Sequence, residues 1–141
     1  MRPRTDRNEL EKYHEGLIVC SACIGGEVPK KILNDQLEDA EEAVRWYKNL
    51  FGEDYYLELQ RHKATVPRAN HEAYPLQQRA NAKLIEFAKK YNIKLICSND
   101  VHFVNEEHAE AHDRLICLST GKDLDDPKRM LLSLIHISEP T

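Results

Sequence analysis

The sequence has no long hydrophobic run and no excess of basic charge. No apolar stretch approaches the ~18 to 20 residues that span a bilayer, and residues 1–7 lack the apolar stretch of a signal peptide. With 24 acidic and 20 basic side chains the formal net charge is −4, so the chain has no global positive field for coating nucleic acid. Its 141 residues, 41% of them hydrophobic, are enough for one domain with a core. We therefore expect a cytoplasmic protein without a membrane segment.

Several motifs of nucleotide and ester chemistry are also missing. The five glycines form neither G-x-x-x-x-G-K-[ST] nor G-x-G-x-x-G, and no G-x-S-x-G sequence occurs. These absences exclude, for this sequence, nucleotide binding by those glycine loops and hydrolysis at a serine elbow.

The four cysteines do not have the pattern of a structural zinc site or a disulfide framework. One C-x-x-C pair is present, formed by Cys20 and Cys23, and nothing marks the chain as secreted. We predict that Cys20, Cys97 and Cys117 are small core residues. Cys23 differs because it follows a predicted strand in a glycine-flanked loop, which makes it a candidate metal ligand.

Short strand-like runs alternate with segments of helical periodicity. The patterns predict strands at 17–20, 55–60 and 94–98, and helices at 36–51, 72–91 and 106–119. In the second of these helices, Leu76, Ala80 and Leu84 are predicted to share the buried stripe. Strands separated by helical crossovers run parallel. Three such units are too few to close a barrel of ~250 residues, so we expect an α/β fold that is either a small open sheet or a piece of a barrel.

The remaining segments are assigned by composition. Residues 1–15 are polar and predict a connecting segment or helix, and residues 61–71 have no sustained period and predict a long exposed loop. Residues 131–141 change character abruptly and look like translated sequencing adapter, so we leave them out of the fold.

Metal-ligating residue types follow each predicted strand. Cys23 follows the first strand, His62 the second, and Asp100 and His102 the third. The C-terminal ends of parallel strands open on one face, where ligands bind. In extended backbone Asp100 and His102 point the same way and could hold one metal ion, whereas a turn aspartate beside a surface histidine is the alternative. One thiolate, one carboxylate and two imidazoles suit zinc, manganese or iron.

The histidines outside the Asp-x-His pair each allow two interpretations. His62 shares a predicted strand face with Glu58 and Gln60, which favours a functional position, while an exposed loop histidine at the end of an edge strand is the alternative. His108 and His112 lie four residues apart on a predicted helix and could bind a metal, but their acidic surroundings favour a solvated face.

Four segments carry a resemblance to a known family. They are residues 15–27 (EGLIVCSACIGGE), 56–62 (YLELQRH), 98–103 (SNDVHF) and 111–122 (AHDRLICLSTGK). In this order they resemble the second half of the PHP domain, the polymerase and histidinol phosphatase domain, of the bacterial DNA polymerase III alpha subunit. The match extends from about residue 2 to about residue 130.

The resemblance implies a partial, distorted (β/α)7 PHP barrel with parallel strands. Residues 16–122 would form the C-terminal part of the barrel domain, and residues 123–130 would begin a link toward the polymerase palm. The complete domain would hold a divalent metal cluster, with Cys23, Asp100 and His102 among its ligands and His62 at the rim. His102 or His62 would protonate the leaving oxygen during phosphoester hydrolysis.

The resemblance also implies a parent protein. The chain would be a fragment of a replicative DNA polymerase that meets DNA and replisome subunits through the rest of the polymerase. Its PHP part would be a metal-dependent phosphoesterase of the 3′ to 5′ exonuclease type or a structural module, and we expect the fragment alone to be inactive. A free-standing PHP phosphoesterase of the histidinol-phosphatase kind is the alternative, and a non-catalytic α/β module is the third interpretation.

Overall fold

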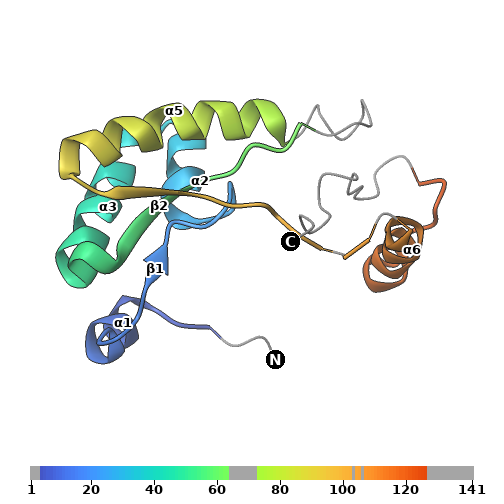
Figure 1. Cartoon of the computed structure of the whole chain (residues 1–141), viewed down its shortest axis with the longest axis horizontal. Coiled ribbons are helices and arrows are strands. Elements are labelled where there is room, and N and C mark those ends of the chain that lie inside the picture. The colour runs from blue at the N-terminus through green and yellow to red at the C-terminus, as the bar shows by residue number, and fades with distance from the viewer. Residues whose placement is uncertain (1–3, 64–72, 103, 106, 127–141) are drawn as a thin grey trace. The chain divides into compact units, whose positions relative to one another are not determined.

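The computed structural model describes residues 4–63, 73–102, 104–105 and 107–126 (Figure 1). These residues belong to two compact units, which we describe separately. The first unit comprises Met1–Leu59 and Arg79–Cys97, and the second comprises Gln60–Gln78 and Ser98–Thr141. Most of the loop predicted at 61–71, the residues from 127 to 130 and the adapter-like tail lie outside the described residues.

The first unit contains a parallel three-stranded sheet. Strands β1 (Val19–Cys20), β2 (Tyr55–Leu59) and β3 (Lys94–Cys97) lie in the order β1-β2-β3. Both pairings are parallel, as expected for strands joined by helical crossovers. The predicted α/β class is confirmed in this partial form, while a closed (β/α)7 barrel goes beyond these three strands. β1 begins two residues later than predicted because its pairing starts at Val19, opposite the first residue of β2.

Helices precede, connect and follow the strands along the chain. They are α1 (Arg7–Tyr13), α2 (Glu27–Leu33), α3 (Leu37–Phe51), the short 3-10 helix η1 (Gly52–Asp54), α5 (Tyr74–Tyr91) and α6 (His108–Thr120). The three long predicted helices are confirmed as α3, α5 and α6, and the polar segment 1–15 contains α1. Pro75 falls in the first turn of α5, where the missing N–H has no intrahelical partner to lose. Gly52 ends α3 with a φ of 57°, a conformation that glycine adopts without a Cβ clash.

The core of the first unit lies between β2 and the helices. Tyr55 and Leu57 alternate along β2 and are almost fully buried, as a strand with one covered face requires. Their cluster combines residues of α2, α3 and α5. The members from these helices and from the connection between α5 and β3 are Val28, Ile32, Ala40, Ala43, Val44, Phe51, Leu84, Phe87, Ala88 and Ile93. The buried residues of α3 recur at the spacing of three and four residues that the sequence predicted.

Two of the three cysteines predicted as core residues are exposed. Cys117 is buried on α6, in agreement with the prediction, but Cys20 and Cys97 are exposed. The prediction is wrong for these two because Cys20 and Cys97 end the outer strands β1 and β3, and all four residues of β3 are exposed. Among the described residues, no helix is both long and apolar enough to cross a membrane.

Candidate metal-binding site

The second unit brings together two loops that the sequence predicted to carry ligands. One loop follows β2 and contains Gln60 and His62, and the other follows β3 and contains Ser98 and Asp100. The Nε2 of Gln60 donates to the Oγ of Ser98 at 3.3 Å. The same offset of 38 residues separates His62 from Asp100, whose backbone N–H donates to the Nε2 of His62 at 3.1 Å. Two hydrogen bonds therefore join the two loops, and the residues that form them are two positions apart in each loop.

In the Asp100–Val101–His102 loop, a backbone carbonyl determines which ring nitrogen of His102 carries a proton. The Nδ1 of His102 lies 2.7 Å from the backbone oxygen of Asp100. A carbonyl oxygen can only accept, so Nδ1 carries the proton and Nε2 is the acceptor nitrogen of the neutral ring. The Asp100 carboxylate lies on the same loop, with Oδ1 3.9 Å from His102 Nδ1, and both side chains are partly open to solvent. Such an arrangement, with the second ring nitrogen held by a carbonyl, is typical of histidines that bind metals.

His62 occupies a very different environment. Its side chain is 4% exposed, which excludes the exposed loop histidine, and β2 is the central strand of its sheet rather than an edge. The backbone N–H of His62 donates to Oε1 of Gln77 at 2.7 Å, and Nε2 of Gln77 lies 3.0 Å from Nδ1 of the imidazole. His62 is thus enclosed between Gln77 and Asp100.

Gln77 is a site residue that sequence reasoning missed. Leu76 was predicted to lie on the buried stripe of α5, but Leu76 is 40% exposed and Gln77 is buried. Gln77 is three residues before Ala80 and seven before Leu84, so it shares their face of the helix. A polar residue at that spacing was the signal that could have identified it, since a buried amide needs partners.

His112 also lies closer to the predicted ligands than its acidic surroundings suggested. Its ring centroid is 5.7 Å from that of His102, with an interplanar angle of 60°. His112 is half-buried and His108 is exposed, so the solvated-face interpretation holds for His108.

Cys23 lies in the first unit, in a tight loop between β1 and α2. Ser21 extends the ladder beyond β1, since its N–H donates to the oxygen of Tyr56 and its Oγ accepts the N–H of Glu58 at 2.8 Å. Gly26 donates its N–H to the oxygen of Cys23 at 2.8 Å, and closes the turn. The thiol of Cys23 is exposed and forms no disulfide, and its Sγ accepts the N–H of Gly25 at 3.5 Å.

Cys20 is a poorer candidate for a thiolate ligand. Desolvation of its thiol and the charge of Glu58 raise the pKa of Cys20 above its usual value. A thiolate is the form that binds metals, so this environment disfavours metal binding at Cys20.

The structure thus places Asp100, His102 and His62 in one unit and Cys23 in the other. In the part of the chain that the structure describes, no three histidine, cysteine, aspartate or glutamate side chains are grouped closely enough to hold a metal ion together. The donor chemistry of Asp100 and His102 nevertheless fits a divalent metal, because a partly exposed carboxylate and an unprotonated imidazole nitrogen occur on one short loop.

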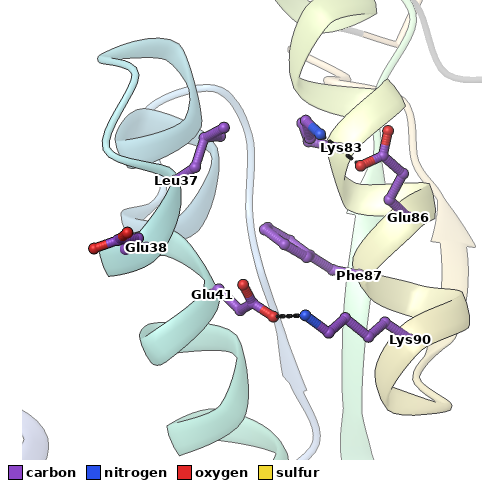
Figure 2. Close-up of a pocket in the computed structure, with 7 residues that line it drawn as sticks. All are labelled: Leu37, Glu38, Glu41, Lys83, Glu86, Phe87 and Lys90. Atoms are coloured by element: carbon purple, nitrogen blue, oxygen red, sulfur yellow. Dashed lines mark hydrogen bonds and ion pairs between the residues drawn. The ribbon is translucent and has the colours of Figure 1, made fainter.

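A groove between α3 and α5 in the first unit has a different character. It encloses about 220 Å³ and is lined by Leu37, Glu38, Glu41, Lys83, Glu86, Phe87 and Lys90. Figure 2 shows Glu41 and Lys90 paired across the groove, beside the ring of Phe87. The hydrogen bond from Lys90 is the main reason that the pKa of Glu41 lies below its usual value. Paired surface charges of this kind give the groove no evident catalytic group.

Comparison with known proteins shows what the chain is similar to. Residues 1–62 match the family model of the PHP domain. The chain is also 42% identical over 129 residues to the DNA polymerase III subunit alpha of Borreliella burgdorferi, covering 92% of this chain and 10% of that protein. The corresponding subunits of Thermus aquaticus and Aquifex aeolicus are 37% and 42% identical over 128 and 125 residues, again covering 10% of each protein. The chain is therefore homologous to a PHP-containing segment of the DNA polymerase III alpha subunit, and it spans about a tenth of the length of these relatives.

Proposed function

We propose that the chain forms part of the PHP domain of a replicative DNA polymerase alpha subunit and contributes to a divalent metal site that hydrolyses phosphoester bonds. Its ligands from this chain are Asp100 and His102, and the ligand role of Cys23, which lies in the other compact unit, stays a prediction from the sequence. The observation that carries the proposal is the hydrogen bond between His102 Nδ1 and the oxygen of Asp100. It leaves the lone pair on Nε2, the nitrogen that a metal would use, on the same loop as the Asp100 carboxylate.

The donor types of this loop indicate which metals would suit the site. A carboxylate and an imidazole together suit zinc, manganese or iron better than calcium or magnesium. When bound, such an ion would activate water near neutral pH and offset negative charge on the phosphate. This chain's own contribution is to hold the donor atoms, and the substrate that we propose is a phosphodiester at the 3′ end of DNA.

The two histidines have different access to a substrate. The N–H of His102 is directed to a backbone carbonyl, and His62 is 4% exposed. A general acid must bring its N–H to the leaving oxygen, so the geometry supports the ligand role for His102 more than a proton-donor role. The proton-donor role of His62 and His102 stays a prediction.

The wider setting follows from the relatives rather than from this chain's geometry. Similarity to the DNA polymerase III alpha subunits supports the polymerase interpretation over the free-standing phosphoesterase. We propose that contact with DNA and with replisome subunits occurs through the rest of such a polymerase, in the cytoplasm.

Metal binding can be measured on the 141-residue chain. We expect calorimetric titration to show binding of Mn²⁺ or Zn²⁺, and Asp100→Asn to weaken it roughly 10-fold or more, because a ligand loses its charge. His14→Gln is the matched control, since His14 makes the same Nδ1 contact with a backbone oxygen, that of Glu11 at 2.8 Å. Equal affinities for the parent chain and Asp100→Asn would reject the site.

Hydrolysis needs the complete domain. In a full-length alpha subunit that contains this segment, Asp100→Asn is expected to abolish metal-dependent 3′ exonuclease activity while polymerisation continues. An unchanged exonuclease rate would contradict the catalytic part of the proposal, and metal binding without hydrolysis would favour a structural module.

A further inference from the structure

His62 lies where three segments of the second unit meet. They are the loop after β2, the first turns of α5 and the loop after β3. Gln77 and Asp100, its partners in the two other segments, are 15 and 38 residues away in the sequence. A buried histidine with partners on two distant segments can fix the position of one relative to the other.

The direction of two contacts follows from chemistry alone. A backbone N–H can only donate, so Oε1 of Gln77 accepts the N–H of His62, and Nε2 of His62 accepts the N–H of Asp100. The third contact, between Nε2 of Gln77 and Nδ1 of His62, has a direction that depends on the ring tautomer. His62 is therefore anchored to α5 on one side and holds the loop after β3 on the other.

Both backbone groups of Asp100 are engaged by histidines. Its N–H is bound to His62 and its carbonyl oxygen to Nδ1 of His102. The peptide groups on either side of the Asp100 Cα are thereby oriented. Partial burial makes the loss of such a bond costly, because water does not fully replace the acceptor.

We propose that His62 is a positioning residue that holds the Asp100–Val101–His102 loop in its metal-binding conformation, and that Gln77 orients His62. The inferred effect on metal binding rests on the proposed function, whereas the inferred effect on the loop conformation rests on the hydrogen bonds of His62. His62 then acts on the metal site through the backbone of Asp100.

Two substitutions of His62 distinguish a role as hydrogen-bond acceptor from a role as proton donor. His62→Gln places a carbonyl oxygen close to the position of the imidazole Nε2, whereas His62→Leu fills the space without an acceptor. In the metal-free chain, hydrogen exchange at the Asp100 amide, followed by NMR, is expected to be roughly fivefold faster or more in His62→Leu and close to the parent in His62→Gln. The affinity for Mn²⁺ is expected to fall roughly 10- to 100-fold in His62→Leu and to be largely retained in His62→Gln.

A substitution at a second position distinguishes the loss of these hydrogen bonds from misfolding of a His62 variant. Gln77→Leu removes the partner of His62 without changing the imidazole, and is expected to accelerate exchange at Asp100 in the same way. Circular dichroism and protected amides of the first unit, such as those of α3, show whether each variant retains its fold.

The outcomes distinguish the two proposals. Unchanged exchange at Asp100 in both His62→Leu and Gln77→Leu overturns the positioning role, as does equal acceleration in His62→Leu and His62→Gln. Faster exchange in His62→Leu with an unchanged Mn²⁺ affinity overturns the inferred effect on metal binding. Faster exchange in a chain whose parent form binds no metal supports the positioning role and rejects the proposed function.

Discussion

Tyr55 combines deep burial with a polar atom that has no partner. It stacks on Tyr47, with ring centroids 5.2 Å apart, and its side chain is 1% exposed. Among the described residues, no group forms a hydrogen bond with its Oη. Burial, followed by the charges of Tyr47 and Glu27, raises the pKa of Tyr55 well above its usual value, so the hydroxyl stays neutral. The aromatic ring accounts for the packing of this residue, and the hydroxyl opposes it.

Removing this hydroxyl is expected to stabilise the chain. Tyr55→Phe keeps the stacked ring and deletes an unsatisfied buried group, so we expect the free energy of unfolding to rise by about 1 kcal/mol. Urea unfolding followed by circular dichroism measures the change. Tyr56→Phe, at the half-buried neighbouring position, is the control, and a loss of stability in Tyr55→Phe would show that the hydroxyl has a partner.

At the scale of elements, the loop between β1 and α2 depends on one glycine. A Cβ at Gly26 would lie 2.2 Å from the oxygen of Ser21, 3.1 Å from the oxygen of Cys23 and 3.2 Å from the Cβ of Ala22. Two of these atoms belong to the backbone, so they cannot move aside without distorting the turn. The position of Cys23 after the strand therefore requires a residue without a side chain at position 26.

Gly26→Ala is expected to destabilise the chain by about 2 kcal/mol or more, because the added methyl group overlaps backbone atoms. Gly25→Ala is a closely matched control, since a Cβ there would meet the Sγ of Cys23 at an ordinary 3.7 Å. Thermal unfolding of the two variants gives the comparison. A melting temperature for Gly26→Ala equal to that of Gly25→Ala would contradict this account of the loop.

Across the first unit, Glu27 joins three helices through its carboxylate. Oε1 accepts hydrogen bonds from Arg7 of α1 at 3.0 Å and Lys31 of α2 at 2.9 Å, and Oε2 accepts one from Tyr47 of α3 at 3.0 Å. Burial opposes ionisation of Glu27, but the bonds from Lys31 and Tyr47 and the charges of Lys31 and Arg7 outweigh it and lower its pKa. Burial and the bond to Glu27 raise the pKa of Tyr47 to about 12.

This network predicts a dependence of stability on pH. The pKa of Glu27 in the folded chain lies below its usual 4.5, so its contribution is complete above pH 4.5 and is lost as the pH falls through the folded value. Glu27→Gln is therefore expected to be less stable than the parent at pH 7, and the difference should shrink as the pH falls below 4.5. Denaturant unfolding at a series of pH values tests this, with the exposed Glu38→Gln as control. A difference that is constant with pH would exclude the Glu27 carboxylate as its source.

Much of the architecture was predictable from local patterns. The apolar spacing of α3, α5 and α6 identified each helix to within two residues, and the alternation of strands with helices predicted the parallel sheet. Sequence reasoning also identified Asp100 and His102 as neighbours on a loop after β3. It did not identify Gln77, because apolar side chains alone defined the predicted stripe on α5, which therefore included the exposed Leu76 and left out the buried amide.

The sequence by itself determined the α/β class, the parallel direction of the strands and the loops on which ligand-type residues lie. These properties depend on periodicity and on chain direction, which are local. Only the tertiary structure decided that His62 is enclosed between Gln77 and Asp100, and that Cys20 and Cys97 are exposed. The physical reason is that burial and hydrogen bonding depend on partners far along the chain, which periodicity does not record.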